Sequence, residues 1–497
     1  MTGGPFPARP GIIIPFFRTK CEGFARRAAY GQNGLAGRTL PPGSFRRARM
    51  KSVYIETYGC QMNVADSETV GGLLRQRGYS LAATPDEADV ILLNTCAVRE
   101  HAEDRVLGRL GEMARYKHMR PGVVLGVLGC MAQHLKGRLL EQNRFVDLVA
   151  GPDSYRRLPD LLEQAANERI VDVRLDHAEL YDGIEPARQD GVTAWITVQR
   201  GCDKHCTFCI VPAVRGRERC VPLEDVVREA ESVAARGVRE VCLLGQTVNS
   251  YHDGRHDFAD LLKAVAQVPG LFRIRFTSPY PTDFNDRTIE VMATEPKIAR
   301  HVHLPLQSAS DRVLEKARRR YNISGFDAVL RRLREAIPGI AVSTDIIVGF
   351  HGEDEAAFRE TCDYLERARF DFAFMFKYSK RSQTAAYRWK EEIDEQTKTQ
   401  RLQKVIEIQE RISKEIQQAC VGQTAKVLVE GTSKKSGERL FGKTSEFRQV
   451  VFDAQESPGR EIRPGDLVTV RIESATGHTL LGRLEEGDGH EDLHQRR

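Results

Sequence analysis

Long hydrophobic runs are missing from this 497-residue sequence. One of its most apolar stretches, GIIIPFF at 11–17, is much shorter than the roughly 18 to 20 residues that a membrane-spanning helix needs, and Pro15 interrupts it. We therefore expect no membrane span and no membrane partner. With 41% hydrophobic and 29% charged residues, the composition is typical of a chain that folds around buried cores.

Acidic residues are scarce at the amino terminus. Residues 1–49 contain eight Arg and one Lys but only Glu22 as an acid, a charge of +8. Removing them from the totals of 74 basic and 69 acidic residues leaves 65 and 68, a net charge of −3. The overall charge of +5 is therefore no argument for nucleic-acid binding, which only local clusters could support.

Segment 1–49 is rich in Arg, Gly and Pro and has no apolar period. We expect a disordered extension or a segment translated from an upstream start, because Met50 opens a clear strand pattern. An Arg-rich targeting peptide is the alternative. The polar tail 486–497 is also expected to be disordered.

The sequence also lacks the even number of cysteines that a complete set of disulfides within the chain would need. The eleven cysteines are an odd number and cannot all form disulfides within the chain. Their clustering is typical of thiolates that bind metal in a reducing compartment. We therefore expect a cytoplasmic protein.

Residues 51–150 alternate apolar strands with helical stretches, which predicts βαβ units and a parallel sheet. The expected strands are VYIETYG (53–59), VILLNT (90–95) and VVLGVLG (123–129). Each is followed directly by a cysteine: Cys60, Cys96 and Cys130. The carboxyl ends of parallel strands meet at one sheet edge, so these cysteines could share a metal site there. Small apolar residues in tight turns are the alternative.

Residues 151–190 are polar and irregular, and we expect a linker. A second α/β series covers 191–420. Its expected strands are 195–200, 240–245, 273–278, 301–306, 343–350 and 371–379, with amphipathic helices between them. Six βα units predict an open, partial barrel whose chemistry lies at the carboxyl ends of the strands. A helical connector at 397–418 then leads to 421–485, where short strands and polar turns predict a small antiparallel barrel of a kind that binds nucleic acid.

RGCDKHCTFCIVP (200–212) places Cys202, Cys206 and Cys209 within eight positions of one another. A closed structural zinc site needs four ligands, commonly from two C-x2-C pairs. His205 or Cys220 could complete such a site, although neither has a usual spacing. Iron–sulfur cubanes are normally held by four thiolates. A cubane with only three would leave one iron open for the amino and carboxylate groups of a methionine moiety.

The C-x3-C-x2-C loop resembles that of the radical S-adenosylmethionine superfamily. RGCDKHCTFCIVPAVRGRER, LLGQTVNSY, LPLQSAS and STDIIVGF closely resemble the bacterial methylthiotransferases that act on tRNA. The resemblance covers about residues 51 to 485 and includes a carboxyl-terminal TRAM-type barrel. It implies two [4Fe–4S] clusters, an auxiliary one on Cys60, Cys96 and Cys130, and a second on Cys202, Cys206 and Cys209 that cleaves S-adenosylmethionine.

The resemblance implies an enzyme that converts N6-isopentenyladenosine to its 2-methylthio derivative beside the tRNA anticodon. A radical suits this reaction, because the C2–H bond of adenine is too weakly acidic for side-chain bases and a cofactor must carry the hard chemistry. Related enzymes acting on threonylcarbamoyl-adenosine tRNA or a ribosomal-protein aspartate are alternatives, as is a zinc-structured RNA-binding protein without catalysis. Partners would be the tRNA anticodon loop and an electron donor such as flavodoxin or ferredoxin; we expect a monomer.

Other polar residues lie at the predicted strand ends. Contacts to S-adenosylmethionine are expected from Gln246, Asn249, Gln307, Ser308 and Asp345, with loop-stabilising roles as the alternative. Contacts to RNA are expected from Arg215, Arg217 and Arg219, and the group from Lys316 to Arg320 could add phosphate contacts or form a solvated face. Thr247 and His351 stand where Asn and Pro are usual in the family.

Overall fold

The computed structural model describes residues 51–97, 100–188, 190–433, 439–453 and 461–485. The segments 1–49 and 486–497, for which we expected disorder, lie outside the described residues. Two compact units make up the chain, one ending at Arg174 and including Glu185–Ala187, the other formed by Leu175–Ile184 and the chain from Arg188 onward. No helix in the described ranges is long and apolar enough to cross a membrane.

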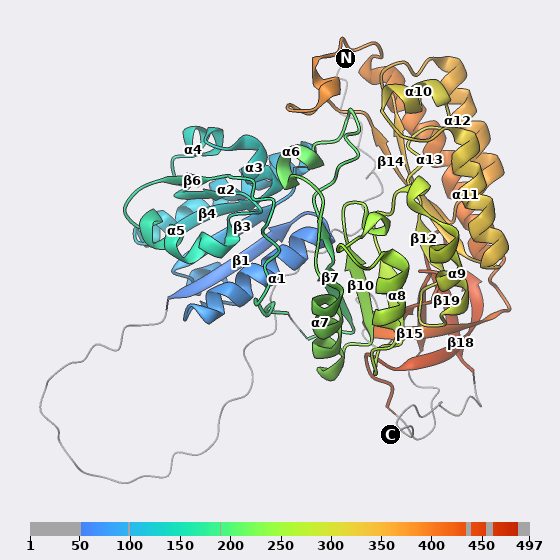
Figure 1. Ribbon diagram of the computed structural model, residues 1–497, viewed down its shortest axis with the longest axis horizontal. Helices are drawn as coiled ribbons and strands as arrows, with labels where there is room; N and C mark the ends of the chain where they lie inside the picture. Colours follow the sequence, from blue (N-terminus) through green and yellow to red (C-terminus); the bar gives the residue numbers. More distant parts are fainter. Residues whose placement is uncertain (1–50, 98–99, 189, 434–438, 454–460, 486–497) are drawn as a thin grey trace, which may run out of the picture. The chain divides into compact units, whose positions relative to one another are not determined.

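The first unit contains a parallel sheet, for which six strands are described in the order β2-β1-β3-β4-β5-β6 (Figure 1). The strands are β1 Ser52–Tyr58, β2 Ser80–Leu81, β3 Val90–Thr95, β4 Val124–Gly129, β5 Leu148–Ala150 and β6 Ile170–Asp172. The helices are α1 Gln61–Gln76, α2 Glu100–Met119, α3 Cys130–Leu135, α4 Arg138–Gln142 and α5 Leu158–Ala165. Every residue of β3 and β4 is buried, because parallel strands are covered on both faces.

The expected linker 151–190 is not irregular throughout. Its first part folds with the first unit, forming α5 and the edge strand β6, which pairs with β5. A strand of three residues is too short to show an alternating pattern in the sequence, which is why the expectation was wrong there.

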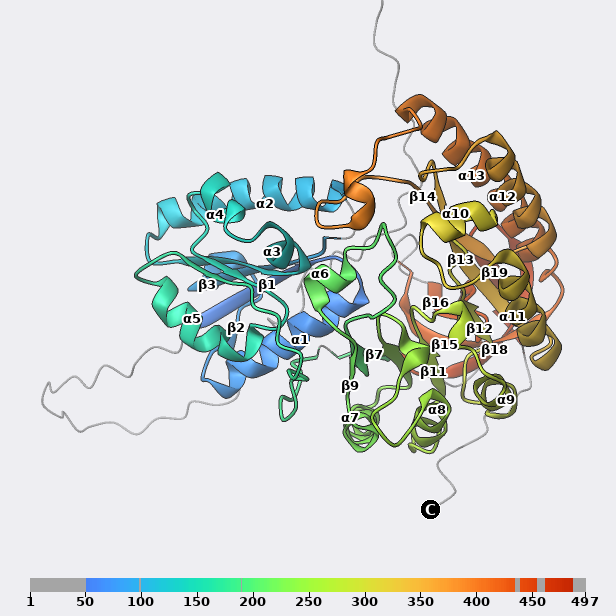
Figure 2. The ribbon, with the colours of Figure 1, turned by 45° about the horizontal axis from the view of Figure 1, so that its top comes forward.

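The second unit begins with a partial barrel of six parallel βα strands, as the sequence predicts (Figure 2). They form two three-stranded sheets, β11-β10-β7 and β12-β13-β14. The strands are β7 Thr193–Thr197, β10 Glu240–Leu244, β11 Arg273–Phe276, β12 His301–His303, β13 Ala341–Val348 and β14 Phe372–Lys377. The helices are α6 Val211–Arg215, α7 Leu223–Ala235, α8 Phe258–Ala266, α9 Asp286–Thr294, α10 Asp311–Lys316, α11 Ile323–Ala336, α12 Glu355–Ala368 and α13 Glu395–Gln418. A short ribbon of β8 Gln199–Arg200 and β9 Arg219–Cys220 flanks the cysteine loop.

Several of these helices begin at a side-chain cap. The carboxylate or amide oxygen of the capping residue accepts a backbone N–H three positions further on, which satisfies a donor that the helix leaves unpaired. The caps are Asp257, Asn285, Asn322, Asp354 and Asp394, before α8, α9, α11, α12 and α13. The apolar faces of these helices then pack on the strands in one continuous core.

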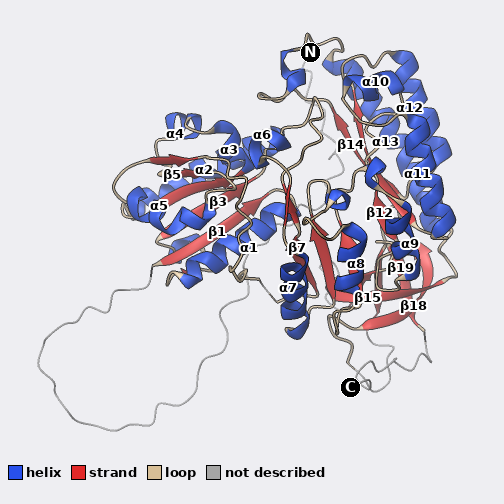
Figure 3. Ribbon diagram, viewed as in Figure 1, coloured by secondary structure: helices blue, strands red, loops and turns tan. Residues whose placement is uncertain are grey.

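The carboxyl-terminal part of this unit is a closed five-stranded barrel, visible as the red strands near the carboxyl end in Figure 3. Its strands are β15 Thr424–Thr432, β16 Arg439–Lys443, β17 Gln449–Asp453, β18 Leu467–Ala475 and β19 Leu480–Leu484. All strand pairs are antiparallel except β17 with β19. The predicted small barrel is thus confirmed, with one parallel pair closing it.

The turn between β16 and β17 docks on the amino ends of the parallel strands. The Arg275 side chain donates to the carbonyl oxygens of Thr444 (2.6 Å) and Ser445 (3.1 Å). Phe447 stacks on His301, with 5.0 Å between ring centroids. Arg273, the first residue of β11, likewise donates to Lys443 O (2.9 Å), and His301 is the first residue of β12. The small barrel therefore lies at the opposite end of the strands from the cysteine loop.

Candidate active site

The cysteines of the first unit lie on three adjacent strand ends. Tyr58 of β1 pairs with Thr95 of β3, and Thr95 pairs with Gly129 of β4, so the three strands end level with one another. Cys96 and Cys130 follow immediately and Cys60 follows one residue later. Adjacent strands are about 4.8 Å apart, which brings the three cysteines together along one edge of the sheet. Cys96 and Cys130 are buried and Cys60 is exposed.

Two buried asparagines hold these strand ends together. The Asn63 side-chain amide donates to Asn94 Oδ1 (3.2 Å) and to Thr95 O (3.3 Å), and the Asn94 amide donates to Asn63 O (2.9 Å). The Cys60 thiol in turn donates to Asn63 Oδ1 (3.4 Å). Our sequence analysis missed both asparagines. Asn94 could have been noticed as the one amide in the apolar strand VILLNT.

Two glycines allow the strand ends to pack this closely. A Cβ on Gly59 would lie 2.8 Å from Cys96 Cβ, and one on Gly129 would lie 2.5 Å from Thr95 O. Gly129 also has φ of +92°, in the region that favours glycine. The chain before Cys60 and before Cys130 is therefore in direct contact with the Thr95–Cys96 segment, and the donor set is compact.

This donor set suits a cluster better than a single ion. Among the described residues, no group of three His, Cys, Asp or Glu side chains could hold one metal ion. Thiolates around one zinc ion stand only about 4 Å apart, given Zn–S bonds of about 2.3 Å in a tetrahedron. A cubane binds each thiolate through a different iron and so accepts a wider separation.

In the second unit, the loop between β8 and α6 carries the other trio. Cys202 N–H donates to Gly216 O (3.2 Å), and Cys209 N–H donates to Cys206 O (3.0 Å). Gly201, with φ of +78°, packs so closely that a Cβ would collide with the Arg217 carbonyl. Thr207 joins the loop to the end of α10, donating from N to Ala317 O (3.1 Å) and from Oγ1 to Lys316 O (2.9 Å).

Burial affects the protonation of two cysteines of this loop, Cys202 and Cys209. It raises the pKa of the Cys202 thiol, and it raises the pKa of Cys209 to about 12, with the neighbouring Cys206 adding to the effect. Both thiols are therefore protonated at neutral pH in the metal-free chain. Metal binding must displace these protons, so loading of the site is expected to be coupled to pH.

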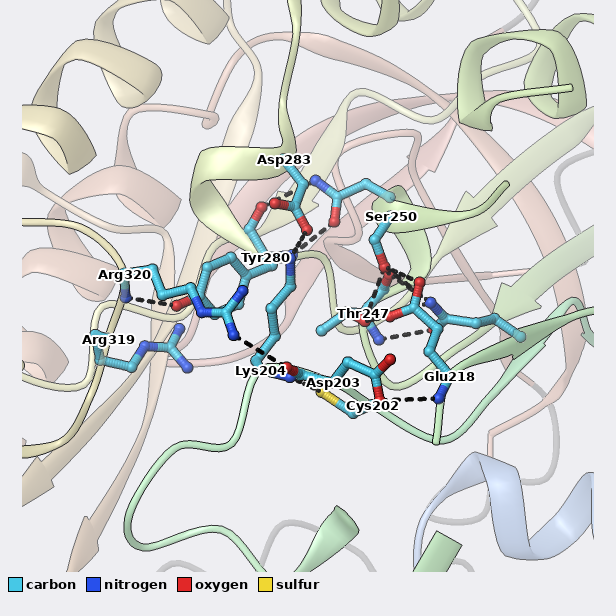
Figure 4. Close-up of polar contacts among 12 residues, drawn as sticks. Cys202, Asp203, Lys204, Glu218, Thr247, Ser250, Tyr280, Asp283, Arg319 and Arg320 are labelled. Carbon is cyan, nitrogen blue, oxygen red and sulfur yellow. Dashed lines mark hydrogen bonds and ion pairs between the residues drawn. The ribbon is translucent and has the colours of Figure 1, made fainter. Parts of the chain in front are cut away.

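A polar network lies beside Cys202 (Figure 4). The fully buried Gln199 accepts from the backbone N–H of Gln246 (3.0 Å) and Thr247 (2.9 Å). Thr247 Oγ1 and Ser250 Oγ both donate to the Glu218 carboxylate, at 3.1 and 2.9 Å. Burial raises the pKa of Glu218. Our sequence analysis missed Glu218, which lies between two arginines in RGRER and gave no signal of its own.

The five residues expected to contact S-adenosylmethionine differ in what they do. The side-chain amide of Asn249 donates to Tyr280 O (2.9 Å), and its oxygen accepts from Tyr280 N–H (2.7 Å). The buried Ser308 bonds Thr361 (3.3 Å). These two residues therefore support loops. Gln246 accepts a hydrogen bond from Gly201 N–H at the cysteine loop.

The remaining two residues, Gln307 and Asp345, lie next to each other in the structure. Gln307 N–H donates to Asp345 O (2.8 Å), and the side-chain oxygen of Gln307 is buried with no hydrogen-bond partner among the described residues. Asp345 pairs with His303, 3.2 Å from Nε2. Gln246, Gln307 and Asp345 thus remain able to face a ligand.

The three arginines expected to contact RNA are also unequal. Arg215 is only 4% exposed, so its guanidinium is not open to solvent in this conformation. Arg219 donates from Nε to Glu179 O (2.9 Å) and from Nη1 to Arg215 O (3.0 Å). Arg217 has 73% of its side chain exposed and pairs with Asp203 at 3.1 Å. Arg217 is therefore the one member of the trio that is exposed.

Three segments of the chain match models of known protein families. Residues 52–151 match the model described as uncharacterized protein family UPF0004, residues 196–365 match the radical SAM superfamily, and residues 418–484 match the TRAM domain. The fold is similar to that of the radical S-adenosylmethionine methyltransferase TsrM from Kitasatospora setae, with a TM-score of 0.52, 15% identity, and coverage of 68% of this chain and 74% of that one. The second unit is thus a radical SAM fold followed by a TRAM barrel.

Full-length relatives then specify the family. The tRNA-2-methylthio-N(6)-dimethylallyladenosine synthase of Chlorobium limicola is 42% identical over 440 residues, 88% of this chain and 98% of the relative. The protein of the same name from Chlorobium luteolum is 45% identical over 436 residues, 87% of this chain and 97% of the relative. The chain belongs to the family of tRNA-2-methylthio-N(6)-dimethylallyladenosine synthases.

Proposed function

We propose that this protein is a radical SAM methylthiotransferase that converts N6-isopentenyladenosine (N6-dimethylallyladenosine) to its 2-methylthio derivative at position 37 of tRNA, consuming two S-adenosylmethionine molecules. The observation that carries the proposal is the presence of two separate three-cysteine sites, one in each unit, in a chain that matches these synthases over nearly their whole length. The family membership also favours tRNA over the ribosomal-protein substrate.

Radical SAM membership implies one [4Fe–4S] cluster and S-adenosylmethionine. Cys202, Cys206 and Cys209 would hold this cluster, which when bound supplies one-electron chemistry able to break the C2–H bond of adenine. The surrounding residues orient the site: Gln199 fixes the 246–250 loop, and Gln246 fixes Gly201 beside Cys202. Gln246, Gln307 and Asp345 are our candidates for direct contact with S-adenosylmethionine.

A second, auxiliary [4Fe–4S] cluster would be held by Cys60, Cys96 and Cys130. The level strand ends, the Asn63–Asn94 hydrogen bonds and the close packing at Gly59 and Gly129 support a compact three-thiol donor set at that sheet edge. When bound, this cluster would present the sulfur that the product gains. Three cysteine ligands would leave one of its irons without a protein ligand.

The partners follow from the same chemistry. We propose the tRNA anticodon loop as substrate, with the TRAM barrel and Arg217 as contacts, and flavodoxin or ferredoxin as the electron donor. We also propose a cytoplasmic monomer whose functional division is 51–150 for the auxiliary cluster, 191–420 for the radical chemistry and 421–485 for RNA binding.

Two measurements test the proposal. Anaerobically purified protein should contain about eight irons per chain if both sites hold cubanes. Replacing Cys60, Cys96 and Cys130 by Ala should remove about half of this iron, and replacing Cys202, Cys206 and Cys209 by Ala should remove the other half. In a strain lacking the gene, the chain should restore the 2-methylthio nucleoside in hydrolysed tRNA, whereas the Cys202→Ala variant should not. Stoichiometric zinc, or a 2-methylthio nucleoside present without the gene and with no redundant enzyme, would refute it.

A further inference from the structure

Three consecutive arginines follow α10, and the middle one has a different environment from its neighbours. Arg318 and Arg320 are exposed, whereas Arg319 is only partly exposed. The N–H of Arg318 donates to Glu315 O (2.9 Å), the N–H of Arg319 donates to Leu314 O (2.8 Å), and Arg318 has φ of +53°. This is a Schellman motif, which ends a helix with one left-handed residue. It reverses the chain and brings Arg319 to the cysteine loop.

The Arg319 guanidinium contacts a cysteine of that loop directly. Its Nη1 donates to Cys206 Sγ (3.4 Å), its Nη2 to Pro305 O (3.3 Å) and its Nε to the Tyr321 hydroxyl (2.9 Å). Its Cζ also lies 4.6 Å from the ring centroid of Tyr280 and 5.0 Å from that of Tyr321. Every nitrogen of the guanidinium is therefore bonded, and two aromatic rings hold the group in place.

The two tyrosines are themselves held firmly. The Tyr321 hydroxyl donates to Pro305 O (2.8 Å). The Tyr280 hydroxyl accepts from Arg320 N–H (2.8 Å), and its backbone is bonded by the Asn249 amide. Figure 4 shows Arg319 and Tyr280 beside the cysteine loop. Asn249 thus supports the residue whose ring positions Arg319.

We propose that Arg319 is a positioning residue that hydrogen-bonds the Cys206 thiolate and raises the reduction potential of the cluster held by Cys202, Cys206 and Cys209. The inference rests on the proposed function, because it needs a cluster at these cysteines. Reduction adds a negative charge to the cluster. A fixed positive charge beside a ligand sulfur lowers the energy of the reduced state more than that of the oxidised state, and hydrogen bonds to the sulfurs are one of the features that set cluster potentials.

The same contacts argue against a phosphate role for Arg319. A bidentate phosphate contact needs two neighbouring guanidinium N–H groups that are free to face the phosphate. Here each of the three nitrogens already donates within the protein, and the group lies against two aromatic rings. The exposed Arg318 and Arg320 remain available to solvent on either side. The three arginines therefore divide between a redox role and a surface role.

The test is a redox titration of the full chain, reconstituted anaerobically with iron and sulfide and measured without S-adenosylmethionine by the electron paramagnetic resonance of the reduced cluster. In Arg319→Gln, we expect the ratio of reduced to oxidised cluster at a fixed potential to fall about tenfold, equal to a potential about 59 mV lower for one electron. The auxiliary cluster is unchanged between variants, so its signal cancels in the comparison. Tyr321→Phe keeps the charge but loses the acceptor of Arg319 Nε, and should give a smaller fall.

Arg320→Gln is the matched control. This variant removes the same charge one residue further along the chain. The exposed Arg320 side chain donates to Asp203 O (3.1 Å), and no bond from it to a cysteine sulfur is found among the described residues. The potential should therefore stay near that of the unaltered chain. An equal shift in both variants, or none in iron-loaded Arg319→Gln, would overturn the inference. If Arg319→Gln binds no iron, Arg319→Lys decides: we expect a lowered potential, and an unchanged one refutes the hydrogen-bond role. Absence of a cluster from the unaltered chain would instead refute the proposed function.

Discussion

Asn63 and Asn94 exchange hydrogen bonds in the interior of the first unit, with the Asn63 amide bonding Asn94 Oδ1 at 3.2 Å and the Asn94 amide bonding Asn63 O at 2.9 Å. Both residues are fully buried. The pair joins the helix after Cys60 to the strand before Cys96, so it connects two cysteines that are 36 positions apart in the sequence.

Asn94→Leu should remove this connection. The Asn63 amide would keep only Thr95 O as an acceptor, and the buried Asn63 O would lose the donor that Asn94 provides. Such a loss costs about 1 to 3 kcal/mol, and Cys60 and Cys96 would lose their relative placement. We expect iron to fall from about eight to about four per chain, while S-adenosylmethionine cleavage by the second unit continues. Asn143→Ala, which removes a half-buried amide bonded to Leu139 O (3.1 Å) in the same unit, is the control and should keep the full iron content. Equal iron in the two variants would contradict the role of the pair.

Gly129→Ala should also affect the auxiliary site. The new Cβ would meet Thr95 O at 2.5 Å in a backbone with φ of +92°, so the segment carrying Cys130 must move. A non-glycine residue in such a conformation costs about 1 to 2 kcal/mol before the clash is counted. Melting temperature and iron content should both fall. Gly122→Ala, where the added Cβ has no neighbour within 4 Å, should change neither; a similar loss there would show that any glycine replacement is damaging.

Arg275→Met should loosen the small barrel from the parallel strands. Arg275 and Arg273 share the buried Glu240 carboxylate, at 3.0 and 3.3 Å, and Arg275 holds two carbonyls of the β16–β17 turn. Breaking a buried ion pair by removing one partner costs about 3 to 5 kcal/mol. Limited proteolysis should release the 421–485 segment faster from this variant. Arg439→Met removes an exposed pair with Asp453 in the same barrel and should cleave at the normal rate; faster release from it would implicate charge alone.

His351→Phe should change how stability depends on pH. Burial lowers the pKa of His351 below its ordinary 6.5, with Lys316 and Lys380 adding to the effect and Glu392 and Glu391 opposing it. Below pH 6.5 the unfolded chain binds a proton that the folded chain resists, so the folded state loses stability as pH falls. Phe cannot titrate and keeps the aromatic contacts to Tyr378 and Trp389.

As the pH is lowered from 7.5 to 5.5, the melting temperature of the unaltered chain should therefore fall more than that of His351→Phe. The paired difference removes the contributions of other histidines. Parallel pH curves for the two proteins would show that His351 is not the responsible group.

Much of the fold could be predicted because its signals are local. Strands such as 90–95 are buried on both faces and therefore read as continuous apolar runs, and their regular spacing along the chain predicts parallel βα units. The edge strand β6 escaped prediction because three residues show no period. The parallel pairing of β17 with β19 depends on closure of the barrel and has no counterpart in the sequence pattern.

The candidate site was predictable in its ligands and not in its surroundings. Arg215, Arg217 and Arg219 alternate in the sequence and looked equivalent, yet the fold buries the first, exposes the second and bonds the third to backbone carbonyls. Glu218 showed no chemical role in the sequence, and Arg319 was expected only as a phosphate contact or part of a solvated face within the group from Lys316 to Arg320. Each acquires its environment only from residues far along the chain.

By itself, the sequence determined the order of the two α/β units and the small barrel, and which cysteines end the strands, since apolar periodicity and residue spacing act over short distances. Only the tertiary structure decided that Asn63 and Asn94 hold the first cysteine set and that Arg319 lies against Cys206. Those relationships depend on strand register and on which side chains become buried, and both arise from contacts between residues that are distant in the chain.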